Sequence, residues 1–486
     1  MLLFTVIVAG CKKDYLETRP SDAVTQQEIL GTTDKISSTL DAAYKTFFAF
    51  SPGGSGRHDD YGQKSWDLSN DLMGTDMVVH TSGYGWYNAS YQYTEWQVPT
   101  ANRQSDMAWF YYYNIIKQAN TILKVIDGAS GPQIDKERFK GEALGMRAYA
   151  YYFLINYYQQ TYKGNETKPG VIIQTDPGDF GGKTRGTVQQ VYDQIIADLT
   201  QAETLLTGKS RVDKVHIDVS VVRGLRARVA LVMEDWATAA AKANLARQGY
   251  LLMSASTYST RSAFSVISNS EWMWGSFIPS DQSTIYASFF SHIDITNQGY
   301  AYLGSQKKIT KALYDQIAVG DVRKTVFQKP GTGSSTSPDY NQLKFQVPVI
   351  GNWAADYVYM RSAEMYLIEA EALARQNQDA SARSVLETMV KARYPAYSAA
   401  AFSGPALISE ILLQRRIELW GEGFSLIDIK RIKLGLNRPT GPGNHGSPNF
   451  DPSVYILPAG DPKFLMRIPQ KELDNNPSLT PADQNP

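Results

Sequence analysis

Two pairs of alanine-rich helical segments constrain the fold of this chain more than any other feature of its sequence. In the first pair, Val219–Met233 and Ala237–Arg247 flank a short break. In the second pair, Arg361–Arg375 is followed closely by Ala380–Arg393, and small or apolar residues recur at spacings that share one helical face. Because small residues let neighbouring helices approach closely, the pattern predicts antiparallel hairpins of the tetratricopeptide type. An ordinary helical hairpin is the alternative.

Two stretches interrupt the helical pattern. Residues 250–351 are rich in Ser, Thr, Asn and Gly, and residues 439–462 are rich in Pro, Gly and Asn. We therefore expect loops and short strands laid over a helical scaffold, where recognition surfaces often lie. The predicted fold class is mainly α, a scaffold of tetratricopeptide-like helical pairs with a loop-rich, short-strand insertion. Further helices are predicted over Lys35–Phe50, Asp106–Ile126, Arg138–Tyr158 and Val188–Leu206.

The N-terminal segment carries the only cysteine of the chain, Cys11, directly after an apolar run. Val8-Ala9-Gly10-Cys11 fits a bacterial lipobox, in which small residues precede the cysteine that takes the lipid. A buried cysteine is the alternative. No Lys or Arg lies between Met1 and Cys11, so we expect a signal peptide that lacks its beginning. The predicted organisation is a signal peptide over 1–10, a lipid-anchored tether over 11–32, a helical region with aromatic loops over 33–249, and a C-terminal region over 250–486.

Composition and motif content argue against several classes of function. The 48 basic and 48 acidic residues balance, so the chain has no net positive charge that would favour binding to nucleic acid. No later apolar run approaches about 18 residues, so we expect no transmembrane helix. The five histidines form no close pair typical of a zinc site. No phosphate-binding, dinucleotide-binding or serine-nucleophile motif is present, and the sequence indicates no cofactor and no metal.

Because glycoside hydrolysis requires only two carboxylates, clusters of acidic residues are candidates for a catalytic site. Five aspartates lie within 18 residues of one another, beside many aromatic residues. We expect them to be solvated loop residues, turn formers or helix caps. For Glu364 and Glu371, the positions of Arg361 and Arg375 predict ion pairs within one helix. The five aspartates are Asp59, Asp60, Asp67, Asp71 and Asp76.

Aromatic residues are in excess, with 30 tyrosines and nine tryptophans. In residues 82–91 the rings alternate with small and polar residues, and rigid amphipathic rings on loops make good binding anchors. We expect Tyr84, Trp86 and Tyr87 to form a stacking platform for sugar rings, with local packing as the alternative. Asp71 is the expected acceptor for a sugar hydroxyl. Packing is the favoured interpretation for Trp109, Tyr112 and Tyr113 in a helix and for Glu271–Trp274 in a buried strand.

Several short motifs resemble signatures of the SusD/RagB family of outer-membrane nutrient-binding lipoproteins. Residues 361–372 (RSAEMYLIEAEA) resemble the family's RxAExYLxxAEA signature. Residues 415–431 resemble its ERRxELxxEGxRxxDLKR block, although Gln414 replaces the Glu and Ser425 replaces an Arg, and Arg467 replaces a Pro in the tail. Weaker matches lie in order along the chain. They are Asn114–Ile126, Gly141–Ala148, Leu225–Ala240, Gly320–Lys324, Ile468–Pro469 and Asn476–Pro477.

The resemblance implies a lipid-anchored, mainly α-helical, non-catalytic protein on the outer-membrane surface of a Bacteroidetes-type bacterium. Such proteins cap a SusC-like TonB-dependent barrel transporter and hand it oligosaccharides, or peptides in some members. An aromatic arc usually grips the ligand. We therefore expect a cell-surface, oligosaccharide-binding lipoprotein with such a transporter as its partner. The alternatives are a peptide-binding member, which needs apolar pockets and backbone partners, and a secreted glycoside hydrolase that uses two of the N-terminal aspartates.

Overall fold

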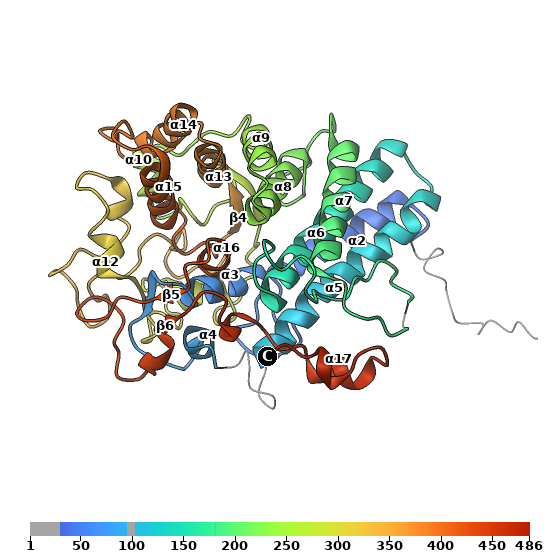
Figure 1. Ribbon diagram of the computed structural model, residues 1–486, viewed down its shortest axis with the longest axis horizontal. Coiled ribbons are helices and arrows are strands. Elements are labelled where there is room, and N and C mark those ends of the chain that lie inside the picture. The colour runs from blue at the N-terminus through green and yellow to red at the C-terminus, as the bar shows by residue number, and fades with distance from the viewer. Residues whose placement is uncertain (1–29, 95–102, 180) are drawn as a thin grey trace, which may run out of the picture.

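A computed structural model describes residues 30–94, 103–179 and 181–486 (Figure 1). Helices run across the right and the top of Figure 1, whereas loops and short strands fill its lower left. The mainly α fold expected from the sequence is confirmed. The helices are α2 (Thr33–Lys45), α3 (Gln63–Leu72), α4 (Asn88–Gln92), α5 (Arg103–Val125), α6 (Gln133–Tyr158), α7 (Val188–Leu206), α8 (Val219–Met233), α9 (Trp236–Ala246), α10 (Ala255–Tyr258), α11 (Phe289–Ile293), α12 (Lys311–Tyr314), α13 (Ser362–Arg375), α14 (Asp379–Lys391), α15 (Gly404–Glu418), α16 (Ser425–Arg431) and α17 (Gln470–Asn475).

The scaffold consists of long helices that pack side by side in chain order. Helix α5 packs on α6, α6 on α7, α7 on α8 and α8 on α9, and the series continues through α13 to α14 and α15. Both helix pairs predicted from the sequence, α8–α9 and α13–α14, are confirmed. The small-residue face of α13 is buried against its neighbours, which allows the close approach that alanine permits. That face comprises Ala363, Leu367, Ala370 and Ala374.

The break between α8 and α9 has a local cause. Glu234 adopts the left-handed conformation, with φ of 62°, and its backbone N–H donates back to the last turn of α8. The next residue, Asp235, caps α9, because its side chain accepts a hydrogen bond from the Thr238 N–H at 3.2 Å. One residue therefore ends the first helix and its neighbour starts the second, which makes the hairpin tight.

Three short antiparallel strand pairs occur among the residues that the structure describes. Strand β2 is buried along its whole length, and the predicted buried strand is confirmed. Strand β4 ends at Arg361 and α13 starts at Ser362, so this pair attaches the loop-rich region directly to the scaffold. The pairs are β1 (Met77–Val79) with β3 (Lys307–Ile309), β2 (Trp272–Ser276) with β4 (Tyr357–Arg361), and β5 (Leu436–Asn437) with β6 (Ile456–Leu457).

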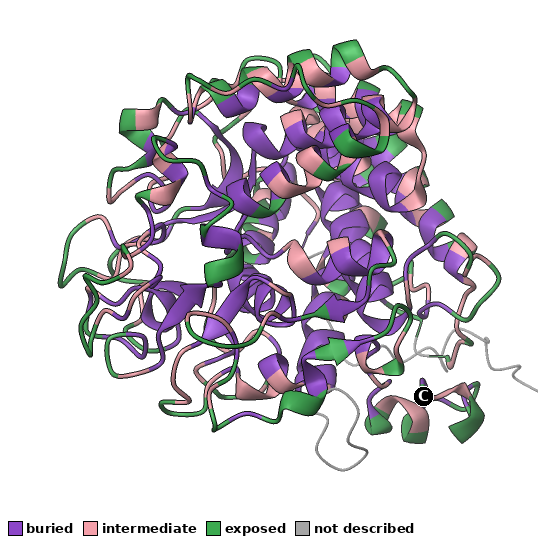
Figure 2. Cartoon of the chain, turned by 60° about the vertical axis from the view of Figure 1, so that its left-hand side comes forward, coloured by how far each residue is buried: buried purple, intermediate pink, exposed green. Residues whose placement is uncertain are grey.

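One large apolar core runs through the helices and the loops, and a smaller one lies between α13, α14 and α15. Buried residues run through the interior of the molecule in Figure 2, whereas exposed ones lie mostly on its outer turns and loops. Helix α3 lies inside the large core, and all of its residues are buried although its sequence is largely polar. Several of its polar groups find partners in distant segments. For example, the Tyr112 hydroxyl of α5 donates to Gln63 at 3.1 Å, and the Asn70 amide donates to the Gly423 carbonyl at 3.2 Å. These hydrogen bonds make its burial tolerable.

A cluster of buried charges joins β2 and β4 to α15. The Glu418 carboxylate lies 2.7 Å from Arg361, 3.0 Å from Arg393 and 3.5 Å from Arg323. Arg361 also contacts Glu271 at 2.6 Å. Four cations balance four carboxylates, so each charge that leaves water finds an opposite one. The members are Arg323, Lys344, Arg361, Arg393, Glu271, Asp321, Glu418 and Glu422.

The expectation that the N-terminal aspartates are solvated is wrong. Each has an exposed fraction between 1% and 5%, and each has partners inside the fold. Asp76 pairs with Arg416 at 2.6 Å, and Asp60 accepts hydrogen bonds from the loop that follows α2. A buried carboxylate is tolerated when it is paired or hydrogen-bonded. The corrected residues are Asp59, Asp60, Asp67, Asp71 and Asp76.

The predicted ion pairs within α13 are confirmed only in part. Glu371 contacts Arg375 at 3.2 Å, as expected, and it also binds Arg431 of α16 at 2.8 Å. Glu364 instead pairs with Arg228 of α8 at 2.6 Å. The side chains therefore connect different helices, which a spacing argument along one helix does not detect.

The lipobox, Cys11 and nearly all of the predicted tether lie outside the described residues. Within the described ranges, none of the helices combines the length and the hydrophobicity that a membrane crossing requires.

Candidate functional site

Aromatic side chains from separate loops meet on the surface of the loop-rich region. The His58 ring stacks on Tyr286 with centroids 5.7 Å apart. The Tyr300 ring lies 5.4 Å from Trp86 and 5.2 Å from Tyr84. Phe50 extends the group on the other side of His58, at 6.2 Å. We call this group the aromatic surface; it comprises Phe50, His58, Tyr84, Trp86, Tyr286 and Tyr300.

The aromatic surface offers several rings to solvent at once. The exposed fraction is 64% for Tyr84, 49% for Phe50 and 43% for Tyr286. Trp86 is half-buried and packs against the large core, while Tyr300 is buried beneath its neighbours. Clustered exposed rings of this kind are uncommon on a soluble surface and typically mark an interaction site.

Polar contacts between the loops hold these rings in place. The Tyr300 hydroxyl lies 2.6 Å from His58 Nδ1, and His292 Nε2 donates to the His58 carbonyl at 2.8 Å. Gly83, with φ of 48°, lets residues 82–85 lie against residues 304–305, because a Cβ there would come within 2.1 Å of Ser305 Oγ. Loops distant in sequence are therefore fixed relative to one another.

Below the aromatic surface the interior is polar but carries little charge. The His292 ring stacks on Tyr61 at 5.5 Å and on Tyr300 at 5.0 Å. Burial, reinforced by the nearby Lys307 charge, holds the pKa of His292 well below its usual value, so the imidazole is neutral. Burial also lowers the pKa of Lys307 to about 7, and its amine donates to the Ser305 carbonyl at 2.7 Å.

Charged and hydrogen-bonding groups border the rings. The Arg57 guanidinium lies 5.0 Å above the Trp86 ring, and its side chain is half exposed. Its ion pair with Asp59 is long, at 3.8 Å, which leaves guanidinium donors available to a ligand. Ring faces with an adjacent donor suit a ligand that presents flat C–H faces and hydroxyl groups.

Two of the residues predicted for the site lie in the interior. Tyr87 is buried, and its hydroxyl lies 2.5 Å from that of Tyr61. Asp71 is buried in α3 and accepts hydrogen bonds from the N–H groups of Gly423 and Ser425, at 3.0 and 3.1 Å. Burial raises the pKa of Asp71 to about 6. Tyr84 and Trp86 are thus brought together at the surface, whereas Tyr87 and Asp71 serve packing and the placement of α16.

The sequence prediction missed Phe50, His58, Tyr286 and Tyr300. The last two lie in residues 250–351, the segment predicted to carry recognition loops, so a weak signal was present. No local pattern indicates that Tyr286 and Tyr300 join the same group as Tyr84, because more than 200 residues separate them from it in the chain.

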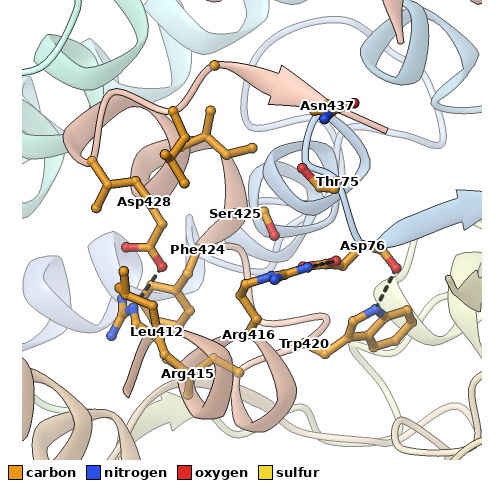
Figure 3. A pocket seen from close by; sticks show the side chains of 15 residues that line it. Thr75, Asp76, Leu412, Arg415, Arg416, Trp420, Phe424, Ser425, Asp428 and Asn437 are labelled. Atoms are coloured by element: carbon orange, nitrogen blue, oxygen red, sulfur yellow. Dashed lines mark hydrogen bonds and ion pairs between the residues drawn. The ribbon is translucent and has the colours of Figure 1, made fainter. Parts of the chain in front are cut away.

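Away from the aromatic surface, a hollow with a volume of about 380 Å³ lies between α15, α16 and β5 (Figure 3). Most of its lining is apolar, and its charged side chains already pair with one another. Arg415 contacts Asp428 at 2.7 Å, and Arg416 contacts the carboxylate of Asp76. The backbone carbonyl of Asp76 also accepts a hydrogen bond from the Trp420 indole N–H. Because these groups are engaged, the hollow offers few donors or acceptors for sugar hydroxyls.

No cluster of three or more His, Cys, Asp or Glu side chains suited to a metal ion occurs within the described parts of the chain.

Comparisons with known proteins agree with this fold. A family model described as starch-binding and associating with the outer membrane matches residues 15–231, and the model of the SusD family matches residues 339–486. The SusD-like protein P2 of Formosa agariphila is 35% identical over 136 residues. That match spans 26% of this chain and 26% of the relative, so only about a quarter of the relative's length is compared.

Solved structures extend the likeness over nearly the whole chain. A SusD-like carbohydrate-binding protein from Bacteroides vulgatus is 29% identical, with a TM-score of 0.82 over 94% of this chain and 98% of its own. A SusD superfamily protein from Bacteroides thetaiotaomicron is 22% identical, with a TM-score of 0.79 over 94% and 100%. Surface glycan-binding protein A of the latter species, solved with laminarihexaose, is 16% identical, with a TM-score of 0.70 over 93% and 99%. The last two likenesses establish a shared fold.

Proposed function

Because the chain belongs to the SusD/RagB family, we propose that it is a cell-surface, oligosaccharide-binding lipoprotein that delivers nutrients to a SusC-like TonB-dependent transporter. The observation that carries this proposal is the aromatic surface, where exposed rings and the Arg57 guanidinium lie side by side. Rings of this kind stack on the apolar faces of sugars while the guanidinium donates to hydroxyls. The carbohydrate-binding relative from Bacteroides vulgatus, similar along almost its whole length, supports the same ligand class.

The geometry argues against the glycoside hydrolase alternative. Hydrolysis needs two carboxylates on either side of an accessible glycosidic bond. The N-terminal aspartates are buried and already held by partners, such as Asp59 by Arg103 at 2.8 Å and Asp76 by Arg416. We therefore propose binding without turnover. A peptide ligand remains the alternative cargo, and it is an outcome of the test below.

Membrane attachment and partnership complete the proposal. Cys11 takes the lipid, as its lipobox predicts, and holds the protein at the outer membrane. A lipid anchor localises a receptor but moves nothing across a bilayer, so uptake needs a transporter. Gentle detergent extraction from the native host tests this point. Co-migration with a TonB-dependent barrel supports the partnership, and migration of the protein alone contradicts it.

A binding assay tests the central claim. Calorimetric titration with a panel of oligosaccharides that includes laminarihexaose should give saturable heats, and the same mixtures should release no reducing ends. Mixed peptides serve as the competing ligand class. Saturable binding heats with peptides but with no oligosaccharide overturn the glycan assignment. Release of reducing ends that survives repurification of the protein overturns the proposal that it binds without turnover.

A further inference from the structure

Two hollows lie near the aromatic surface and share a wall. One, of about 570 Å³, lies between β3 and the loop of residues 331–339. The other, of about 550 Å³, lies between the end of β1 and the loop of residues 441–449. His80, Lys308 and Pro442 line both hollows, so together they form one trough that passes over Lys308. We call this feature the trough.

Lys308 is the unusual residue of the trough. It lies in β3 opposite Val78, and only 8% of it is exposed. Among the residues that the structure describes, no carboxylate lies within 4.0 Å of its ammonium group and no hydrogen-bond acceptor engages it. Burial lowers the pKa of Lys308, because most of the side chain is shielded from water and its ammonium group, which opens onto the trough, has no close anionic partner.

The other ionisable groups of the trough do not neutralise this cation at close range. The Asp339 carboxylate attracts Lys308 from beyond ion-pair distance, and its oxygens accept hydrogen bonds from the N–H groups of Gly331 and Gly333, at 2.9 and 2.8 Å. Lys311 pairs with Asp315. Burial and the Lys308 charge lower the pKa of His80, so it is neutral at pH 7. Lys308 is therefore the trough's available cation in the described structure.

The trough and the aromatic surface are joined by a short segment. His80 and Thr81 line the trough, and Tyr84 belongs to the aromatic surface. Four residues, even fully extended, span at most about 14 Å. The His80 N–H donates to the Gln306 carbonyl at 3.0 Å, which fixes the start of this segment on β3. The trough and the nearest exposed ring therefore lie within about the length of a short oligosaccharide of each other.

We propose that Lys308 binds an anionic substituent, a carboxylate or a sulfate ester, of an oligosaccharide whose rings stack on the aromatic surface. This inference rests on the proposed function and specifies its substrate class as acidic glycans. An ammonium group has three donors, and hydrogen bonds from a charged donor to a charged acceptor are the strong ones. An anion in the trough would give the buried cation the partner that the protein itself does not provide.

The test compares Lys308→Met with Lys391→Met, which removes the same charge from an exposed ion pair on α14. The carboxylate probe is an oligogalacturonate with its carboxyl-reduced counterpart, and the sulfate probe is a carrageenan oligosaccharide with its desulfated counterpart. We expect at least one acidic probe to bind the wild type more tightly than its neutral counterpart, less so at high salt. Lys308→Met should weaken that binding about tenfold or more and leave the neutral counterpart unaffected.

Stability provides a second readout. Because the substitution removes a poorly partnered buried charge, Lys308→Met should keep or raise the melting temperature. A clear drop in melting temperature means that Lys308 is structural and contradicts the inference. Lys308→Arg, which keeps the charge, should retain acidic-glycan binding, and loss in this variant also contradicts it.

The outcomes separate the inference from the function on which it rests. If neutral glycans bind the wild type as tightly as acidic ones do, and Lys308→Met changes neither affinity, the inference is overturned and the proposed function stands. Absence of binding to every glycan overturns the proposed function itself. The acidic probe whose binding Lys308→Met weakens shows whether the substituent is a carboxylate or a sulfate ester.

Discussion

Replacing Glu418 with glutamine tests the buried charge cluster directly. The Glu418 carboxylate contacts Arg361, Arg393 and Arg323 within 3.5 Å, and the whole cluster is balanced at four charges of each sign. The neutral amide leaves one positive charge unbalanced in the interior, and its NH₂ group faces guanidinium donors. Breaking a buried ion pair in this way costs about 3–5 kcal/mol. Since the total stability of a domain is typically about 5–15 kcal/mol, the loss should be large.

Equilibrium urea unfolding at pH 7, followed by circular dichroism and tryptophan fluorescence, measures the change. Glu387→Gln is the matched control, because Glu387 pairs with Lys391 at 2.5 Å on the surface of α14. An exposed pair of this kind contributes about 1 kcal/mol or less. We therefore expect Glu418→Gln to lower the unfolding free energy several times more than Glu387→Gln does.

The reasoning fails if the two substitutions have equal effects. A loss below about 1 kcal/mol for Glu418→Gln would mean that water or rearranged side chains replace its contacts, and that the cluster is not held by pairing. An unchanged m-value is also expected, because the substitution should alter stability and not the surface exposed on unfolding.

Four further predictions concern the ligand, pH and the anchor. Tyr84→Ala should weaken oligosaccharide binding by about 2 kcal/mol, roughly thirtyfold in Kd, at an unchanged melting temperature, because the ring is mostly exposed. Trp86→Ala should also weaken binding, but it should lower the melting temperature, since Trp86 packs on the core. Calorimetric titrations and melting curves of both variants test these two predictions. Burial raises the pKa of Glu142 from 4.5 to about 7. The contribution of this carboxyl to the free energy of unfolding is therefore fully present below pH 4.5 and is lost as the pH rises through 7. Glu142→Gln should flatten the dependence of stability on pH between these values, and an unchanged slope contradicts the assignment. Cys11→Ser, expressed with a complete signal sequence, should lose lipid labelling and leave the membrane fraction.

Helical periodicity predicted the scaffold well because each long helix buries one face. The predicted bounds of α7 and α8 agree with the structure to the residue, and both alanine-rich pairs were found. Helix α2 ends at Lys45, earlier than the predicted Phe50, since the following residues turn into the loop that carries Phe50 and His58. Local signals thus located elements but not every boundary.

The site was harder to predict because it depends on contacts between distant loops. Tyr84 was correctly expected at the surface, but the ring of Tyr87 turns inward where α4 begins, with φ of 65°. The aspartates were misjudged for a similar reason. Asp76 is buried because Arg416, 340 residues later, folds over it, and nothing near Asp76 in the sequence indicates this.

Helix α3 has a consequence for how the molecule unfolds. It contacts α16 as well as α4, α11 and β1. Its Asp71 accepts hydrogen bonds from Gly423 and from Ser425 of α16, and its Ser69 hydroxyl accepts one from Ser90 of α4. Neither α16 nor α4 can separate from α3 without leaving buried polar side chains unpaired, which is costly. The chain should therefore melt in one cooperative transition, with equal calorimetric and van't Hoff enthalpies, although its length would allow several independent units.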